Sequence, residues 1–207
     1  MKITDPKITI TTEYNLLDSV KEKNYSNMLF SENIDREIII DNETFDSCIF
    51  KGIDFSNIKL TNVELIDVIF ENCDLSNKSF DNKLIQRVKF INCRMIGVSF
   101  IGSSIKDVIF ESCNAKYINF ADARVSKMLV NESDFSEMCF QETDIRNLEF
   151  NNVNLSRSEI LKTPLENIDI STCNIEGIMI DNESLKGMII DKFQSIDLIG
   201  MLGVNIK

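Results

Sequence analysis

The 207-residue chain has the length of one domain, and its 43% apolar content is enough for a core. Its formal net charge of −11 argues against direct binding of nucleic acid, which depends on neutralising phosphates with Lys and Arg. The sequence has no His, no Gly-rich phosphate loop, and no Ser or Cys with an evident base nearby, which argues against an enzyme. We therefore expect no catalytic residues, no cofactor and no bound metal.

The compartment predicted from the sequence is the cytoplasm. No apolar run is long enough to span a membrane, and the start MKITDPKITI lacks the layout of a signal peptide. Six Cys without such a signal indicate free thiols in a reducing environment.

Residues 1–37 are the least regular part of the chain. We expect them to form an N-terminal capping segment that covers the first coil of the following region, because an exposed coil end is an open sheet edge. Within this segment Leu16, Leu17 and Val20 predict a turn of helix.

Residues 38–190 carry a period of five. Every fifth residue from Ile40 to Ile190 is apolar, 31 in succession, and 12 of the 14 Phe belong to this series. A step of five winds around an α-helix and alternates between the faces of a strand, so neither element lines these residues up. Only a chain that turns a corner every five residues directs them all inward.

A second period of twenty lies on the first. Cys73, Cys93 and Cys113 recur at this spacing, which predicts coils with four sides of five residues and like residues stacked on like. The three Cys are interpreted as small apolar fillers of an inward position, since Ser133 and Val153 hold equivalent places. A metal ladder and disulfides are the alternatives.

Corners are predicted two residues after each member of the fivefold series, where Gly and Asn gather. Both residues tolerate the left-handed backbone of a tight turn. Lys78 and Lys83 fall on inward positions in adjacent units, so we expect a local bulge there with both ammonium groups directed outward. A functional groove is the alternative. The corner residues are Gly52, Gly97, Gly102, Gly177, Gly187, Asn57, Asn62, Asn72, Asn77, Asn82, Asn92, Asn147, Asn152 and Asn167.

The series of repeats resembles the pentapeptide-repeat proteins, whose pattern is A(D/N)LXX, over about three-quarters of the chain. The resemblance implies an all-β fold, a right-handed quadrilateral parallel β-helix of nearly eight coils with an N-terminal cap and a short C-terminal helix.

Residues 191–207 change character and predict a C-terminal helix and tail. Asp191 with Gln194 indicates an N-terminal capping box, and Gly203 a C-cap. The helix between them is apolar on two sides, so we expect one side to cover the last coil and the other to join a second copy in a two-fold homodimer. A monomer with the helix folded back is the alternative. The predicted dimer interface is Phe193, Ile196, Leu198, Ile199, Met201 and Leu202.

This tail also resembles the C-terminal end of the Qnr-type quinolone-resistance subgroup. That resemblance implies dimers joined at this end, and a partner, DNA gyrase or topoisomerase IV, bound by imitating duplex DNA. The net charge and the lack of a spanning apolar run separately predict no direct nucleic-acid partner and no membrane partner. The residues that carry the resemblance are Gly187, Ile190, Asp191, Phe193, Gln194, Leu198, Leu202, Gly203 and Val204.

Acidic residues supply the candidate partner surface. Outward carboxylates on a rod could imitate the phosphates of DNA and attract a basic DNA-binding saddle. A merely solubilising face is the alternative. The candidate residues are Glu132, Asp134, Glu137, Glu142, Asp144, Glu149, Glu64, Asp67, Glu71 and Asp74.

An outward apolar stripe provides a competing surface. Ile49, Ile69, Ile109 and Leu129 recur at multiples of twenty residues. Such a stripe either serves strand propensity alone or marks a scaffold module that binds some other protein.

Overall fold

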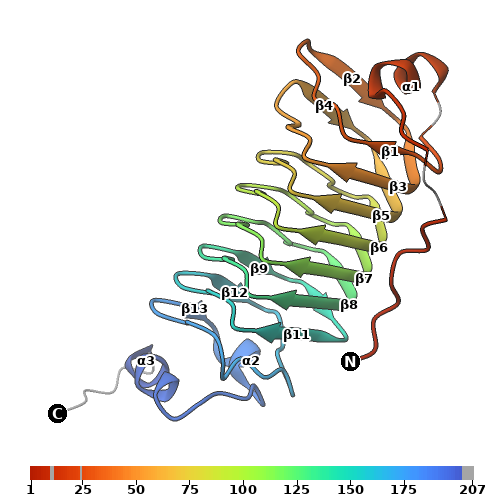
Figure 1. Ribbon diagram of the computed structural model, residues 1–207. Helices are drawn as coiled ribbons and strands as arrows, with labels where there is room; N and C mark the ends of the chain where they lie inside the picture. Colours follow the sequence, from red (N-terminus) through yellow and green to blue (C-terminus); the bar gives the residue numbers. More distant parts are fainter. Residues whose placement is uncertain (10–11, 24, 202–207) are drawn as a thin grey trace.

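A computed structural model describes residues 1–9, 12–23 and 25–201 as a parallel β-solenoid of about eight coils (Figure 1). Long strands bend around one corner of each coil and pair with the same segment of the next coil. Shorter strands line another side of the rod in two separate ladders, β2–β4 and β9–β12–β13. The twenty-residue period of the sequence therefore sets the register of strand pairing: Phe50 pairs with Phe70, Phe70 with Phe90, and Phe90 with Phe110.

The elements follow one another in a regular order. The strands are β1 (Leu29–Phe30), β2 (Ile38–Asp41), β3 (Thr44–Lys51), β4 (Ile58–Thr61), β5 (Glu64–Glu71), β6 (Leu84–Ile91), β7 (Ser104–Glu111), β8 (Arg124–Asn131), β9 (Cys139–Gln141), β10 (Asp144–Ile145), β11 (Leu148–Asn151), β12 (Glu159–Leu161) and β13 (Met179–Ile180). The helices are α1 (Leu16–Glu22), α2 (Asn182–Leu185) and α3 (Gln194–Met201).

The fivefold series forms the core, as predicted. Every member is buried except Ile145, Leu185 and Ile190, which are half-buried against the core. Phe rings stack along the rod with centroids 5.0 Å apart for Phe50 and Phe70 and 5.2 Å for Phe70 and Phe90. This spacing is close to the distance between paired strands, so each ring lies on the ring of the next coil.

Corners with positive φ recur at the predicted places. All five predicted Gly and most of the predicted Asn have this conformation, but Asn57 and Asn147 do not. Residues that rarely adopt it do so as well, among them Tyr117 with φ 60° and Arg157 with φ 56°. The position in the five-residue repeat thus determines the left-handed backbone conformation, even for residue types that rarely adopt it.

An irregularity is present at Lys78, but its ammonium group is not directed outward as predicted; at Lys83, which is half-buried, the carbonyl oxygen accepts the Ser104 N–H at 2.8 Å as in a regular coil. The Lys78 Nζ donates to the Ile58 carbonyl oxygen at 2.9 Å. In the following coils the equivalent carbonyl accepts a main-chain N–H instead, as Lys78 does from Ser99 at 3.0 Å. Burial lowers the pKa of Lys78, which is half-buried. The Lys78 ammonium group therefore replaces the main-chain N–H that would otherwise donate to this carbonyl oxygen between coils, and the side chain does not extend freely into solvent.

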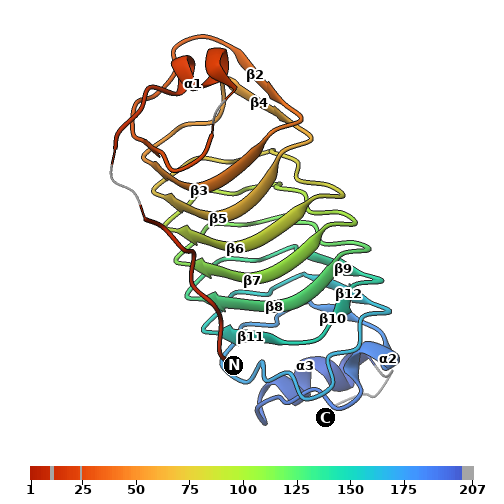
Figure 2. The same ribbon diagram turned by 90° about the vertical axis from the view of Figure 1, so that its right-hand side faces the viewer.

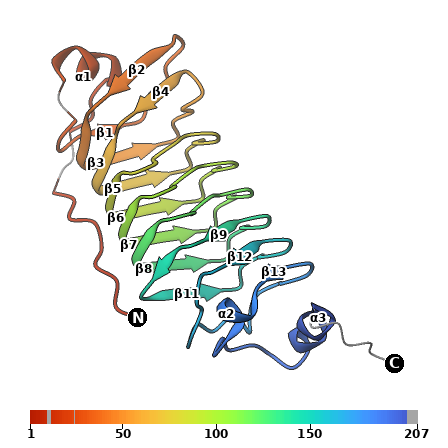
Figure 3. The ribbon, with the colours of Figure 1, turned by 180° about the vertical axis from the view of Figure 1, so that it is seen from behind.

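The N-terminal segment departs from the prediction. Helix α1 lies over the first coils, but residues 1–9 do not cap the rod: they run down its side past β5, β6, β7 and β8 (Figures 1 and 3). We call residues 1–9 the strap. The prediction that all of residues 1–37 cover the first coil is wrong for the strap, because acidic side chains on the rod bind its main-chain N–H groups.

Helix α3 closes the other end, as Figure 2 shows. The capping box is confirmed: Asp191 Oδ1 accepts the Gln194 N–H at 2.8 Å, and Gln194 Oε1 accepts the Asp191 N–H at 2.9 Å. Gln194 Nε2 also donates to the carbonyl oxygens of Ile170 and Cys173, both at 2.8 Å. One side chain thus caps the helix and the open edge of the last coil together. The predicted C-cap at Gly203 lies outside the described residues.

Candidate partner-binding surfaces

The ten carboxylates predicted to form a partner surface do not lie in one row. Residues of one row differ by multiples of twenty, and among the ten only Asp74 with Asp134 and Glu64 with Asp144 satisfy this. The others occupy different rows around the rod. Consequently the ten residues do not make one acidic wall, although their role in binding remains a prediction.

Most of the ten are paired with a basic group, usually one coil away. Among the described residues only Glu64, Glu132 and Asp144 of the ten have no ion pair. The pairs are Asp67–Arg87, Asp74–Arg94, Glu71–Lys51, Asp134–Lys116, Glu137–Arg157, Glu142–Lys162 and Glu149 with the amino group of Met1. Exposed pairs of this kind add little stability but weaken the local negative field. The signal was in the sequence, since four of these bases follow their acid by twenty residues.

Asp67 is the clearest exception to the prediction of outward carboxylates. It is 5% exposed, its Oδ1 accepts the Lys7 N–H at 2.8 Å, and its two oxygens accept from Arg87 at 2.6 Å each. The hydrogen bond from Arg87 holds the pKa of Asp67 below its usual value despite burial. A carboxylate used in this way cannot stand in for an exposed phosphate.

One corner of the rod concentrates acidic residues, of which four are exposed and three half-buried, Asp81 and Asp181 among the latter accepting hydrogen bonds within the rod. It lies where the chain passes from the short strands to the long ones, for example between β4 and β5, at the first, second and fourth residue of each coil. Seven carboxylates occur at these positions from Asp41 to Asp181, against two bases, Arg124 and Lys162. We call the seven the acidic corner: Asp41, Glu64, Asp81, Asp122, Glu142, Asp144 and Asp181. Three of them, Glu64, Glu142 and Asp144, belong to the predicted set.

Helix α3 offers an apolar surface at the C-terminal end. Leu198, 5% exposed, packs with the core, whereas Phe193 and Ile196 are 67% and 54% exposed and Ile199 is half-buried. The helix therefore has the two predicted sides, one covering the rod and one open. The side chain of Met201 and all of Leu202 lie outside what the structure describes, and dimerisation through this surface stays a prediction.

The outward apolar stripe is not open. The strap passes along it: Asp5 forms an ion pair with Lys89 at 2.8 Å, in the same row as the stripe, and the Thr4 N–H donates to Asp107 Oδ1 at 3.0 Å. Ile109 beside these contacts is 8% exposed, while Ile49, Ile69 and Leu129 are half-buried. The sequence showed the stripe but gave no signal for the segment that covers it.

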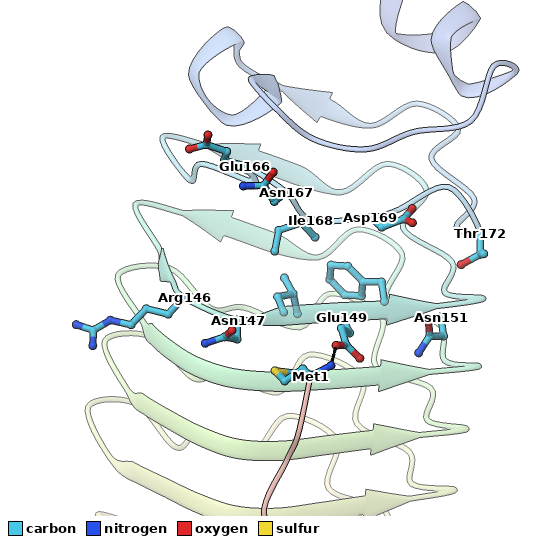
Figure 4. A pocket seen from close by; sticks show the side chains of 12 residues that line it. Met1, Arg146, Asn147, Glu149, Asn151, Glu166, Asn167, Ile168, Asp169 and Thr172 are labelled. Carbon is cyan, nitrogen blue, oxygen red and sulfur yellow. Dashed lines mark hydrogen bonds and ion pairs between the residues drawn. The ribbon is translucent and has the colours of Figure 1, made fainter.

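A hollow lies where the long strands end, on the side of β11 (Figure 4). It has a volume of about 610 Å³, and the end of the strap reaches it, where the Met1 amino group binds Glu149. Arg146, Asn147 and Asp169 also line it. Polar side chains spread along its wall without a nucleophile–base pair, so the hollow shows no arrangement for catalysis.

The thiols are free and, apart from half-buried Cys139, buried. Cys73, Cys93 and Cys113 each donate to a main-chain carbonyl oxygen about one coil earlier. Over the part of the chain that the structure describes, no group of three or more Cys, Asp or Glu is placed to hold a metal ion. Within those residues, too, no helix has the length and apolarity to cross a membrane.

Known proteins were compared with the chain. A pentapeptide repeat region model matches residues 63–137, and a model of eight pentapeptide repeats matches residues 44–77. No curated protein matches. Solved structures that resemble the chain include full-length QnrB1, a plasmid-mediated fluoroquinolone resistance protein, at 19% identity and a TM-score of 0.47, covering 86% of this chain and 89% of that one.

Two further structures show the range of this similarity. A trypsin-treated variant of QnrB1 is 21% identical with a TM-score of 0.46, covering 88% of this chain and 89% of that one. HetL, involved in heterocyst differentiation regulation in the cyanobacterium Nostoc, is 12% identical with a TM-score of 0.36, covering 86% and 96%. The matched repeats, the unbroken fivefold series and the stacked coils together make this chain a member of the pentapeptide-repeat family.

Proposed function

We propose that the protein is a non-catalytic cytoplasmic rod that binds a type II topoisomerase, DNA gyrase or topoisomerase IV, and protects it from quinolones. The observation that carries this proposal is the acidic corner, which runs along the rod with few bases beside it. Asp41, Asp122 and Asp144 in it are exposed and, among the described contacts, their carboxylates have no partner. The residues of the Qnr-type tail motif also fit their expected role, since Asp191, Gln194 and Leu198 close the end of the rod.

Carboxylates that follow one corner of a rod resemble one strand of DNA in the sign and direction of their field. A basic DNA-binding saddle would be attracted to them over about 8 Å at physiological salt, and the attraction would fall as salt rises. The same charge repels nucleic acid itself, so the expected partner is a protein that normally binds DNA. The homodimer joined through α3 would extend the rod to twice its length with a two-fold axis.

The test is a gyrase supercoiling assay in which the protein is titrated with and without a fluoroquinolone. The variant changes Glu64→Gln, Asp122→Asn and Asp144→Asn, removing three charges from the acidic corner. A matched control changes Glu37→Gln, Glu111→Gln and Glu176→Gln, removing three charges from other sides of the rod.

We expect the wild-type protein and the control to restore supercoiling in the presence of the drug, and the corner variant to lose most of this effect. Equal loss in both variants would mean that only net charge matters, and the acidic corner would not be the binding surface. No effect of folded wild-type protein on either enzyme would overturn the topoisomerase proposal and leave a scaffold for another partner as the function.

A further inference from the structure

The strap lies on the rod in a fixed register. The Lys7 N–H donates to Asp67 Oδ1 at 2.8 Å and the Thr4 N–H to Asp107 Oδ1 at 3.0 Å, so residues three apart meet carboxylates two coils apart. Three extended residues advance about 10 Å, and two coils advance about the same distance. The spacing of the strap's N–H groups matches the spacing of the carboxylates because of the length of an extended chain and the pitch of the coils. Any other extended segment would have the same spacing.

The acceptors on the rod are built into it. Asp67 and Asp107 are 5% and 4% exposed; Arg87, from the coil between them, lies 2.6 Å from Asp67, and Lys127, from the coil after Asp107, lies 3.6 Å from Asp107. The main-chain carbonyl groups of the coils are already bonded to neighbouring coils. The carboxylates therefore supply the acceptors that a free sheet edge would otherwise offer to an extended segment. Since a main-chain N–H is present in every residue except Pro, this part of the recognition does not depend on side chains.

Side chains beside the acceptors add selectivity. Lys89 pairs with Asp5, and the stripe residue next to it in the row, Ile109, is buried. On the strap Ile3, Pro6 and Ile8 are half-buried, on either side of that acid. The surface therefore fits an extended segment in which aliphatic residues flank an acidic one.

The strap is held by few contacts. Its other residues are exposed, and of their side chains only Asp5, with Lys89, and Thr9, with Asn27, have a polar partner among the described contacts; the exposed residues are Met1, Lys2, Thr4, Asp5, Lys7 and Thr9. We propose that the face under the strap is a binding surface for an extended acidic–aliphatic segment of another protein, and that the strap is a competitor carried by the chain itself. This surface is distinct from the acidic corner, and its test involves no topoisomerase.

The experiment uses the full chain with the strap loosened. Thr4→Pro with Lys7→Pro removes both N–H donors, and Asp5→Lys, in a separate variant, places a cation against Lys89. The probe is a fluorescein-labelled peptide with the sequence of residues 1–9, and binding is followed by fluorescence anisotropy. Both loosened variants should bind it at least about tenfold more tightly than the wild type, because the strap no longer occupies the site.

Two further variants locate the site. Ile109→Lys in the loosened protein should weaken binding by at least about tenfold, whereas Ile101→Lys, a half-buried outward residue in another row, should leave it unchanged. The proposal is overturned if the peptide fails to bind the loosened variants, if it binds them no better than the wild type, or if both Ile variants weaken binding alike. An increase in hydrogen exchange over the wild type that is confined to residues 1–9 would confirm that the rod of the loosened variants is intact.

Discussion

Tyr117 holds a corner conformation that favours Gly. Its φ is 60°, its ring is 53% exposed, and its row neighbour in the preceding coil is Gly97 with φ 68°. In the left-handed region of backbone conformation a Cβ costs about 1–2 kcal/mol. Replacing the residue with Gly removes this cost, but the greater freedom of Gly in the unfolded chain offsets about 0.5–1 kcal/mol of the gain. We expect Tyr117→Gly to be more stable than Tyr117→Ala by about 0.5–1 kcal/mol in urea unfolding.

The comparison with Ala isolates the backbone, because both variants lose the ring. The same pair of substitutions at Ile39, which is 62% exposed in β2, should reverse the order, since Gly weakens a strand. Equal stability of the two Tyr117 variants would mean that the corner accommodates a side chain without cost.

Asp67 links stability to pH. Its pKa is lowered by the hydrogen bond from Arg87, so the folded state favours the ionised form. The contribution is therefore complete above about pH 4, the unfolded pKa, and is lost as pH falls through the lower folded pKa. Asp67→Asn should cost about 2 kcal/mol at neutral pH and flatten the loss of stability in acid.

Urea midpoints measured from neutral to acidic pH check this. The matched control is Asp41→Asn, an exposed carboxylate at the acidic corner, which should leave both the neutral stability and the acid limb unchanged. An acid limb equally steep in wild type and Asp67→Asn would contradict the assignment to this residue.

At the scale of elements, the sequence predicted repeated structure and local motifs, and missed single contacts between distant segments. The fivefold series alone located the core, and the corners followed from it, because one geometry is imposed on every coil. The capping box at Asp191 was predictable as a local motif. The strap was not predictable, since its bonds join Lys7 to Asp67 and Thr4 to Asp107, residues 60 and 103 positions apart in the sequence, without any periodic signal. The ion pairs at twenty-residue spacing were predictable only in part. The sequence reveals them when acidic and basic residues twenty positions apart are compared.

Gln194 joins two elements and makes the sharpest prediction at this scale. Its amide donates to the carbonyl oxygens of Ile170, which also accepts the Cys173 N–H, and of Cys173, and its oxygen accepts from Asp191. Gln194→Glu keeps the size and the acceptor but replaces the donor with a charge. We expect a loss of about 2–3 kcal/mol, because the Cys173 carbonyl oxygen loses its partner and both carbonyl oxygens then face a carboxylate.

Hydrogen exchange distinguishes this effect from general weakening. Protection should fall in α3 and the last coil while β5, β6 and β7 remain protected, since coils of a solenoid contact only their neighbours. Ser195→Ala is the control: its hydroxyl bonds Lys192 within the first turn and should matter little. Uniform loss of protection along the rod would contradict the local role of Gln194.

At the scale of the molecule, the two ends of the rod are treated differently. Helix α1 and the residues around β1 cover the N-terminal coils, and Tyr25 there is 4% exposed, with burial raising its pKa to about 12. At the C-terminal end α3 covers the coil but turns Phe193 and Ile196 outward. An end that has closed its own sheet edge and still exposes two large apolar side chains has a surface suited to a second copy.

Phe193→Asp with Ile196→Asp tests whether that second copy binds. Light scattering of the wild type should give twice the 23.7 kDa of one chain, and the variant should give the single-chain mass, because charge on an apolar interface must be desolvated without a partner. Ile39→Asp with Met179→Asp adds the same charge at residues 62% and 55% exposed elsewhere on the rod and should remain dimeric. A wild-type protein that is monomeric at micromolar concentration would contradict the dimer, and the apolar side of α3 would then need a different partner. Because the two-fold axis would place the acidic corners of both copies on one long particle, the same double variant should also weaken topoisomerase binding if the partner contacts both halves.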